Sequence, residues 1–159
     1  GWAREKALID LNVVALTELT KLALPHMIEA GGGRIMNVAS TAAFIPGPAM
    51  AVYHASKAYV LSLSAALSEE LKATRVSITA LCPGATATNF AHDAEMTQAR
   101  NFQGRLPSAY EVAISGWRAM RARERTHVPG GRNKATEYAA RLLPRWLAAR
   151  VAGYALARV

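Results

Sequence analysis

Apolar residues recur along residues 6–30 at the spacing of one helical face, which predicts a long amphipathic helix. Pro25 should kink this helix or begin a last short turn, because proline has no backbone donor. Three glycines at residues 31–33 should then end it before the next element. The apolar stripe consists of Leu8, Leu11, Leu16, Leu19, Leu22 and Ala23.

Two short apolar runs predict strands. The first, residues 35–40, is almost continuously apolar and ends at Ser40. The second, residues 76–81, alternates Val, Ile and Ala with Ser and Thr. Between them, residues 49–72 are rich in Ala and Leu and contain neither Gly nor Pro, which favours a helix. Strands of this kind, buried on both faces and separated by helices, indicate an α/β fold with a parallel sheet.

The last third of the chain is expected to be mainly helical. Residues 108–124 should form a helix that begins with a capping box, because Glu111 follows Ser108 by three residues. Residues 126–128 are a strand candidate and residues 129–132 a turn. A further helix is predicted over residues 136–159, broken or restarted at Pro144. Residues 89–105 have no strong period and read as a loop.

The 159 residues amount to one domain at most, and 52% apolar residues are enough for a packed core. The single cysteine, Cys82, allows no internal disulfide and suits a reducing cytosol; we expect a buried, unreactive thiol. The four histidines show no short metal-ligand spacing, so no metal is expected. With neither a signal pattern nor a membrane-spanning run, a cytoplasmic location is predicted.

The net charge of +8 is unevenly placed. Residues 1–99 carry seven Lys/Arg and eight Asp/Glu, whereas residues 100–159 carry twelve and three. Solvated helix faces explain most such asymmetry, and contact with an anionic membrane surface or an acidic partner is the alternative. Without a zinc-finger or RNA-recognition signature, we predict no nucleic-acid binding.

Candidate chemistry lies in the segment Tyr-His-Ala-Ser-Lys at residues 53–57. Tyr53 and Lys57 are four residues apart and would share one helical face. A nearby cation lowers the pKa of a phenol, so Tyr53 could act as a general acid or base. Ser40 ends the first strand, where ligand groups gather in open α/β sheets, and could orient a substrate carbonyl there.

These residues, in this order, resemble the short-chain dehydrogenase/reductase family over residues 3–90. Asn12 is similar to the family's helix asparagine, and residues 33–40 resemble the strand that ends in its catalytic serine. The segment Cys-Pro-Gly-Ala-Thr-Ala-Thr at residues 82–88 resembles the family's Pro-Gly loop. The resemblance implies a Rossmann-like, doubly wound parallel sheet and a homo-oligomer. It also implies hydride transfer between NAD or NADP and a small-molecule carbonyl or secondary alcohol.

By the same resemblance, Tyr53 is the acid/base, Lys57 lowers its pKa and holds the cofactor ribose, and Ser40 binds the substrate carbonyl. Asn12 supports a water in the proton relay. The implied catalytic residues are Asn12, Ser40, Tyr53 and Lys57. The implied cofactor-binding residues are Tyr53, Lys57, Pro83, Gly84, Thr86 and Thr88.

The family's Gly-rich phosphate loop has no counterpart here. The glycines at residues 31–33 follow a helix and precede a strand, whereas a phosphate loop needs the reverse order. We therefore expect a carboxyl-terminal part of the fold that is inactive alone, with a catalytic core portion at residues 1–107 and a basic helical extension at residues 108–159. The alternative is a truncated, non-enzymatic interaction module or membrane-surface module whose basic carboxyl-terminal helix contacts lipid.

Overall fold

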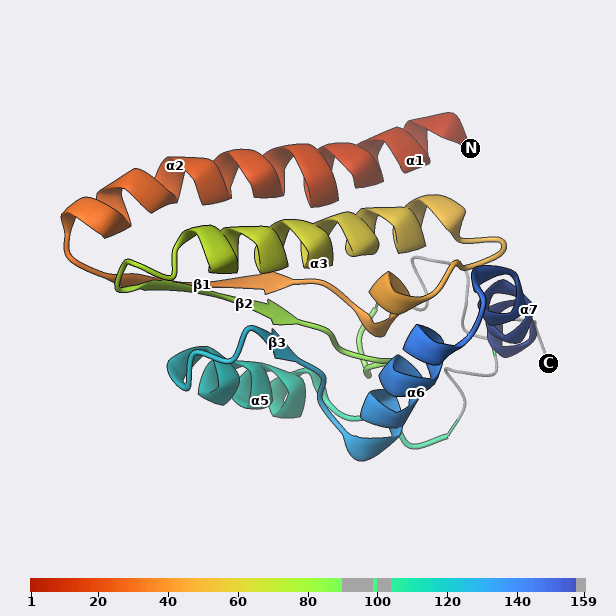
Figure 1. Cartoon of the computed structure of the whole chain (residues 1–159). Coiled ribbons are helices and arrows are strands. Elements are labelled where there is room, and N and C mark those ends of the chain that lie inside the picture. Colours follow the sequence, from red (N-terminus) through yellow and green to blue (C-terminus); the bar gives the residue numbers. More distant parts are fainter. Residues whose placement is uncertain (90–98, 100–103, 157–159) are drawn as a thin grey trace.

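The computed structural model describes residues 1–89, 99 and 104–156, and its strands form one parallel sheet in the order β1-β2-β3 (Figure 1). The register pairs Val38 with Leu81 and Leu81 with His127, so the carboxyl ends of the strands meet at one edge. This arrangement confirms the predicted α/β fold with a parallel sheet. The strands are β1 (Gly33–Val38), β2 (Val76–Leu81) and β3 (Thr126–His127).

Helices cover both faces of the sheet. The amino-terminal helices and α3 lie on one face, α5 lies on the other, and α6 packs against η2 near the carboxyl ends of the strands (Figure 1). The helical elements are α1 (Trp2–Ile9), the π-helix η1 (Asp10–Ala15), α2 (Leu16–Glu29), the 3₁₀ helix η2 (Thr41–Phe44), α3 (Ala51–Glu70), α5 (Ala109–Arg121), α6 (Gly131–Leu142) and α7 (Arg145–Leu156).

The first helix differs in detail from the expected one. It begins at Trp2, contains one π-helical stretch, and continues through Pro25 to Glu29 without a break in its assignment. Pro25 is exposed, so water can satisfy the carbonyl group that its missing N–H leaves unbonded. The predicted glycine stop is confirmed, because Gly31 adopts a φ of 80° and Gly32 N–H donates to Met27 O at 2.9 Å.

The carboxyl-terminal helices largely follow the sequence pattern. At α5 the capping box is present: Glu111 N–H donates to Ser108 Oγ at 3.2 Å, and Ser108 N–H donates to a Glu111 carboxylate oxygen at 2.7 Å. The break at Pro144 also occurs, between α6 and α7. The expected turn at residues 129–132 is partly wrong, since α6 already begins at Gly131, with Gly130 as its N-cap at a φ of 86°.

Two apolar clusters hold the layers together. One packs beneath α2 and α3 and includes Leu24, Leu67 and Ile78. The other lies next to the carboxyl ends of the strands and includes Val60 and Cys82, both with no exposed surface. Because this second cluster anchors α3 against β2, it sets the position of the Tyr-Lys segment relative to the sheet edge. The predicted loop at residues 89–105 lies mostly outside the described residues.

Candidate active site

The ends of β1 and β2 are joined by hydrogen bonds that bring Ser40 beside the loop after β2. Ala39 N–H donates to Leu81 O and Thr41 N–H donates to Pro83 O, both at 2.8 Å. The Ser40 hydroxyl donates to Pro83 O at 3.3 Å and accepts from Ala42 N–H at 3.1 Å. Ser40 therefore caps η2 and stands at the sheet edge where the sequence predicts it.

Tyr53 lies in the first turn of α3, with its side chain close enough to Ser40 for that residue to affect the pKa of the phenol. Burial raises the pKa of the Tyr53 phenol above its ordinary value, and the neighbouring Ser40 side chain partly opposes this shift. The pKa of Tyr53 is thus raised, whereas the sequence predicts that Lys57 lowers it. A phenol with a raised pKa is protonated at neutral pH, the state in which it can donate a proton to an oxygen atom.

Lys57 follows Tyr53 by one helical turn, as predicted, but is held toward the strand. Its Nζ donates to Val38 O at 2.9 Å and lies 5.9 Å from the centre of the Tyr53 ring. Burial lowers the pKa of the Lys57 ammonium, and the nearby Cys82 opposes that shift. Burial is the largest influence on the pKa of Tyr53, and the Lys57 ammonium is held by the Val38 carbonyl.

Asn12 lies within η1 and contacts the segment that carries Tyr53. Its Nδ2 donates to Ser56 Oγ at 3.1 Å, and Ser56 Oγ donates to Tyr53 O at 2.8 Å. Asn12 and Lys57 also line one cleft, of about 430 Å³, along β1. Single π-helical turns are frequent at functional sites, and this one places Asn12 beside that cleft. The sequence predicts Asn12 as a site residue but does not reveal the π-helix.

The loop after β2 contains the remaining predicted residues. Thr86 Oγ1 donates to Gly84 O at 3.0 Å, and Thr88 is exposed at the far end of the loop. Gly84 has no room for a side chain, because a Cβ atom there would lie 2.5 Å from Asn133 Oδ1. Asn133 Nδ2 in turn donates to Pro129 O at 2.7 Å. The loop is thus packed from behind by α6.

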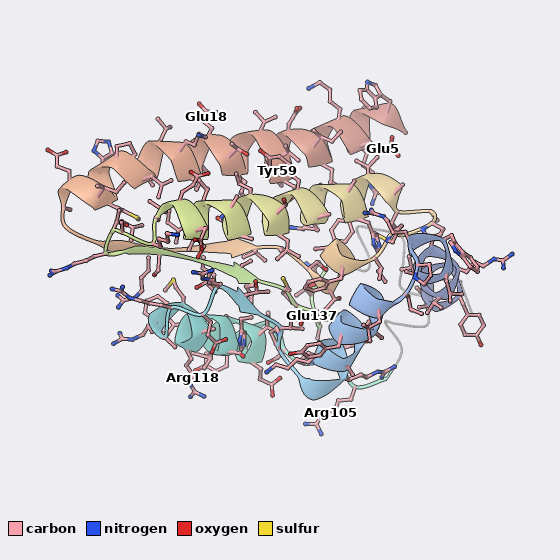
Figure 2. All side chains as sticks on the ribbon, in the orientation of Figure 1. Glu5, Glu18, Tyr59, Arg105, Arg118 and Glu137 are labelled. Atoms are coloured by element: carbon pink, nitrogen blue, oxygen red, sulfur yellow. The ribbon has the colours of Figure 1, made fainter. Side chains whose placement is uncertain are left out.

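Sequence reasoning missed the side chains that α6 brings to this edge. Asn133 supports Gly84, and the buried Glu137 lies close enough to Cys82 to help raise the pKa of its thiol to about 12, after burial itself. Figure 2 labels Glu137 on α6 near the carboxyl ends of the strands. No local signal marks either residue, since both lie in a polar helical stretch that reads as a solvated face.

Among the described residues, no group of three or more His, Cys, Asp or Glu side chains could hold a metal ion. Within the same ranges, the helices are too short or too polar to cross a bilayer.

Family comparisons agree with this geometry. The model of the short chain dehydrogenase family matches residues 3–99. The rat very-long-chain 3-oxoacyl-CoA reductase is 37% identical over 86 residues, which are 54% of this chain and 28% of that protein. Human 17-beta-hydroxysteroid dehydrogenase type 3 is 41% identical over 83 residues, 52% of this chain and 27% of that protein.

Solved structures show the same fold. A short-chain dehydrogenase from Sphingobium yanoikuyae in complex with NADPH superposes with a TM-score of 0.70 at 29% identity, covering 84% of this chain and 53% of that one. The chain thus spans less than a third of those curated relatives and about half of this structure. With a family match over more than half of its residues, this chain belongs to the short chain dehydrogenase family.

Proposed function

We propose that this chain supplies the acid/base half of an NAD(P)-dependent oxidoreductase that interconverts a carbonyl compound and a secondary alcohol. The observation that carries the proposal is that the side chains of Ser40 and Tyr53 lie close together at the sheet edge, with Lys57 one turn away on the same helix. Two hydroxyl groups that meet at the carboxyl edge of a parallel sheet can both reach one carbonyl oxygen.

The proposed chemistry follows from the state of each group. Protonated Tyr53 donates its phenolic proton to the oxygen of the carbonyl as the alcohol forms. Ser40 holds the same oxygen through its hydroxyl, and the Lys57 ammonium places positive charge one turn from the phenol. Asn12 holds the segment that carries Tyr53, through Ser56. In the reverse direction, deprotonated Tyr53 takes the proton from the alcohol.

A nicotinamide cofactor would supply or accept the hydride. Lys57 and the loop from Pro83 to Thr88 offer hydrogen-bond donors and backbone polar groups beside Ser40 and Tyr53. The described residues therefore fit the nicotinamide end of NAD or NADP. The glycines at residues 31–33 lie at the opposite, amino-terminal end of β1, so they are not a pyrophosphate cradle at this edge. The cofactor-binding roles of Pro83, Gly84, Thr86 and Thr88 are part of the proposal.

The names of the relatives support the substrate class. One is a reductase of a 3-oxoacyl thioester and another a dehydrogenase of a 17β-hydroxysteroid, so both act at a ketone or secondary alcohol. We extend only this common chemistry, a small-molecule ketone or secondary alcohol, to the present chain. A homo-oligomer in the cytoplasm, with residues 1–107 as the catalytic portion and residues 108–159 as an extension, completes the proposal.

Replacement of the Tyr53 hydroxyl tests the proposal directly. Turnover of small ketones with NADH and NADPH is measured for the full-length gene product, with whatever sequence flanks these residues. Tyr53→Phe should lower kcat by about 10²- to 10⁴-fold, the usual contribution of a positioned general acid. The matched control is Tyr59→Phe on the same helix, whose hydroxyl bonds Thr17 Oγ1 at 2.8 Å between α2 and α3 (Figure 2). Equal turnover by the Tyr53 variant and the wild type would refute the role of Tyr53.

A second candidate function is attachment to an anionic membrane surface, and the exposed side chains of α6 and α7 favour it. Leu142, Trp146 and Tyr154 are 86%, 64% and 66% exposed, and the Arg150 guanidinium lies 5.9 Å from the centre of the Trp146 ring. Interfacial helices combine Trp and Leu with basic residues in this way. Sedimentation with phosphatidylserine vesicles should show binding at low salt that weakens at high salt and in Trp146→Ser. Absence of binding at low salt would exclude this function.

A further inference from the structure

A second polar cluster lies away from Tyr53, where α5 meets β3. Ser115 Oγ is 2.7 Å from His127 Nε2, and His127 Nδ1 is 2.8 Å from Glu124 Oε2. The three side chains thus form a continuous hydroxyl–imidazole–carboxylate chain. None of them takes part in the chemistry proposed above.

The fold itself sets the spacing between the hydroxyl and the imidazole. His127 is paired with Leu81 in the sheet, and its carbonyl oxygen accepts from Cys82 N–H at 2.8 Å. Next to Ser115 stands Gly116, where a Cβ atom would lie 2.7 Å from Leu81 Cδ2. The glycine therefore allows α5 to approach β2 closely, and this approach carries Ser115 to the imidazole.

The Glu124 carboxylate determines which nitrogen of the His127 imidazole carries the hydrogen. An ionised Glu124 can only accept, so Nδ1 carries the hydrogen and donates it to Oε2. The lone pair of Nε2 then faces Ser115 and accepts its hydroxyl proton. A base that bonds the nucleophile on one side and an orienting carboxylate on the other is the arrangement that activates a serine.

The cluster opens onto a cleft of about 500 Å³, which its three residues line together with Tyr110, Ile114 and Arg118. Mid-helix amide groups are already bonded within α5, so a negative oxygen formed at Ser115 needs a side-chain donor. Arg118 is one turn away on the same helix, and Figure 2 shows its side chain projecting from α5 away from the sheet. Glu111 also lines the cleft, and its apolar part, formed by Ile114, Ala119 and Ala122 beside the Tyr110 ring, suits a small apolar acyl group.

We propose that Ser115, His127 and Glu124 form a second active site, which hydrolyses carboxylic esters of small apolar acids. Ser115 Oγ bonds to the carbonyl carbon while its proton passes to His127 Nε2, and the oxyanion forms in the cleft that the cationic Arg118 also lines. The carbon–oxygen bond to the alcohol breaks, and the alcohol leaves with the proton from Nε2. Water then adds to the acyl carbon, giving its proton to Nε2, and the acid departs as Ser115 recovers its hydrogen.

The test is covalent labelling of the purified protein with diisopropyl fluorophosphate, which transfers its phosphoryl group to an activated serine and releases fluoride. Peptide mapping by mass spectrometry should locate the label on Ser115, and Ser115→Ala should take none there. His127→Gln should slow labelling by about 100-fold or more, since a general base contributes 10² or greater. Hydrolysis of p-nitrophenyl acetate should fall in parallel.

Two further variants separate catalysis from folding. Glu124→Gln changes an exposed residue and keeps its shape, so it should slow labelling while leaving the circular dichroism spectrum unchanged. Ser62→Ala, on the exposed surface of α3, should label like the wild type. An unlabelled Ser115 in folded wild-type protein would overturn the proposal, and so would labelling that His127→Gln and Glu124→Gln leave equally fast. Ketone reduction is measured alongside, so failure of the esterase site is distinguishable from failure of the reductase.

Discussion

At the scale of single residues, the environment of Cys82 shows how burial decides reactivity. Its side chain has no exposed surface, and burial, reinforced by the Glu137 carboxylate, raises the thiol pKa from 9.0 to about 12. The thiolate is the reactive form, so the native thiol should be nearly inert at neutral pH. The expectation of a buried cysteine, drawn from its place after an apolar strand, is confirmed.

We predict that iodoacetamide at pH 8 modifies Cys82 at least about 100-fold more slowly in the native protein than in guanidinium chloride, where the ordinary pKa returns.

The same raised pKa of the Cys82 thiol should destabilise the fold at alkaline pH. Between pH 9 and about 12 the native thiol keeps its proton while the unfolded chain loses it, so the free energy of unfolding falls as the pH rises. Equal modification rates in the native and unfolded protein would contradict the burial that underlies both expectations.

At the scale of elements, α6 packs against the loop after β2 through a close contact between Asn133 and Gly84. A Cβ atom at Gly84 would meet Asn133 Oδ1 at 2.5 Å, and Asn133 cannot move aside without losing its hydrogen bond to Pro129 O. Gly84→Ala should therefore lower the free energy of unfolding by about 1–3 kcal/mol, the usual cost of overpacking. The measurement is chemical denaturation. A double-mutant cycle supplies the control: in an Asn133→Ala background the same substitution should cost less, and an equal cost would show that this contact is not the cause.

Elements that are determined by a few adjacent residues could be predicted from the sequence. Both longer strands and the capping box of α5 follow from a few adjacent residues, whose propensities agree with their final environment. The π-helical stretch around Asn12 and the early start of α6 at Gly131 could not be predicted. Each depends on tertiary packing: Asn12 bonds Ser56 from α3, and α6 packs against η2.

The candidate site likewise contains some features that the local sequence predicts and others that depend on tertiary packing. Ser40, Tyr53 and Lys57 lie near each other in the chain, just after β1 and in the first half of α3, and the structure brings them together as expected. The direction of the Tyr53 pKa could not be predicted, because it depends on how deeply the ring is buried and on the carbonyl that holds Lys57. Asn133 and Glu137 come from more than 40 residues beyond the loop they support, so no local pattern indicates them.

For the whole molecule, the long amino-terminal helix presents an unusually apolar outer surface. Leu19 and Leu22 are 68% and 61% exposed, and Leu19 also lines the cleft beside β1, an edge strand among the described strands. Large exposed apolar patches mark surfaces that become covered by another protein surface. The edge of a parallel sheet next to such a patch makes association with another chain more favourable, because its backbone groups can pair with that chain.

We therefore predict that the 159-residue chain, purified alone, self-associates through this surface. Sedimentation velocity over a range of concentrations should show species larger than a monomer, and Leu19→Lys combined with Leu22→Lys should shift the distribution toward the monomer, since charged groups resist burial. Leu142→Lys is the control: this leucine is 86% exposed on α6, far along the chain, and its replacement should leave the distribution unchanged. A monomer at every concentration, or an equal shift in the control, would show that the apolar surface of the long helix does not drive association.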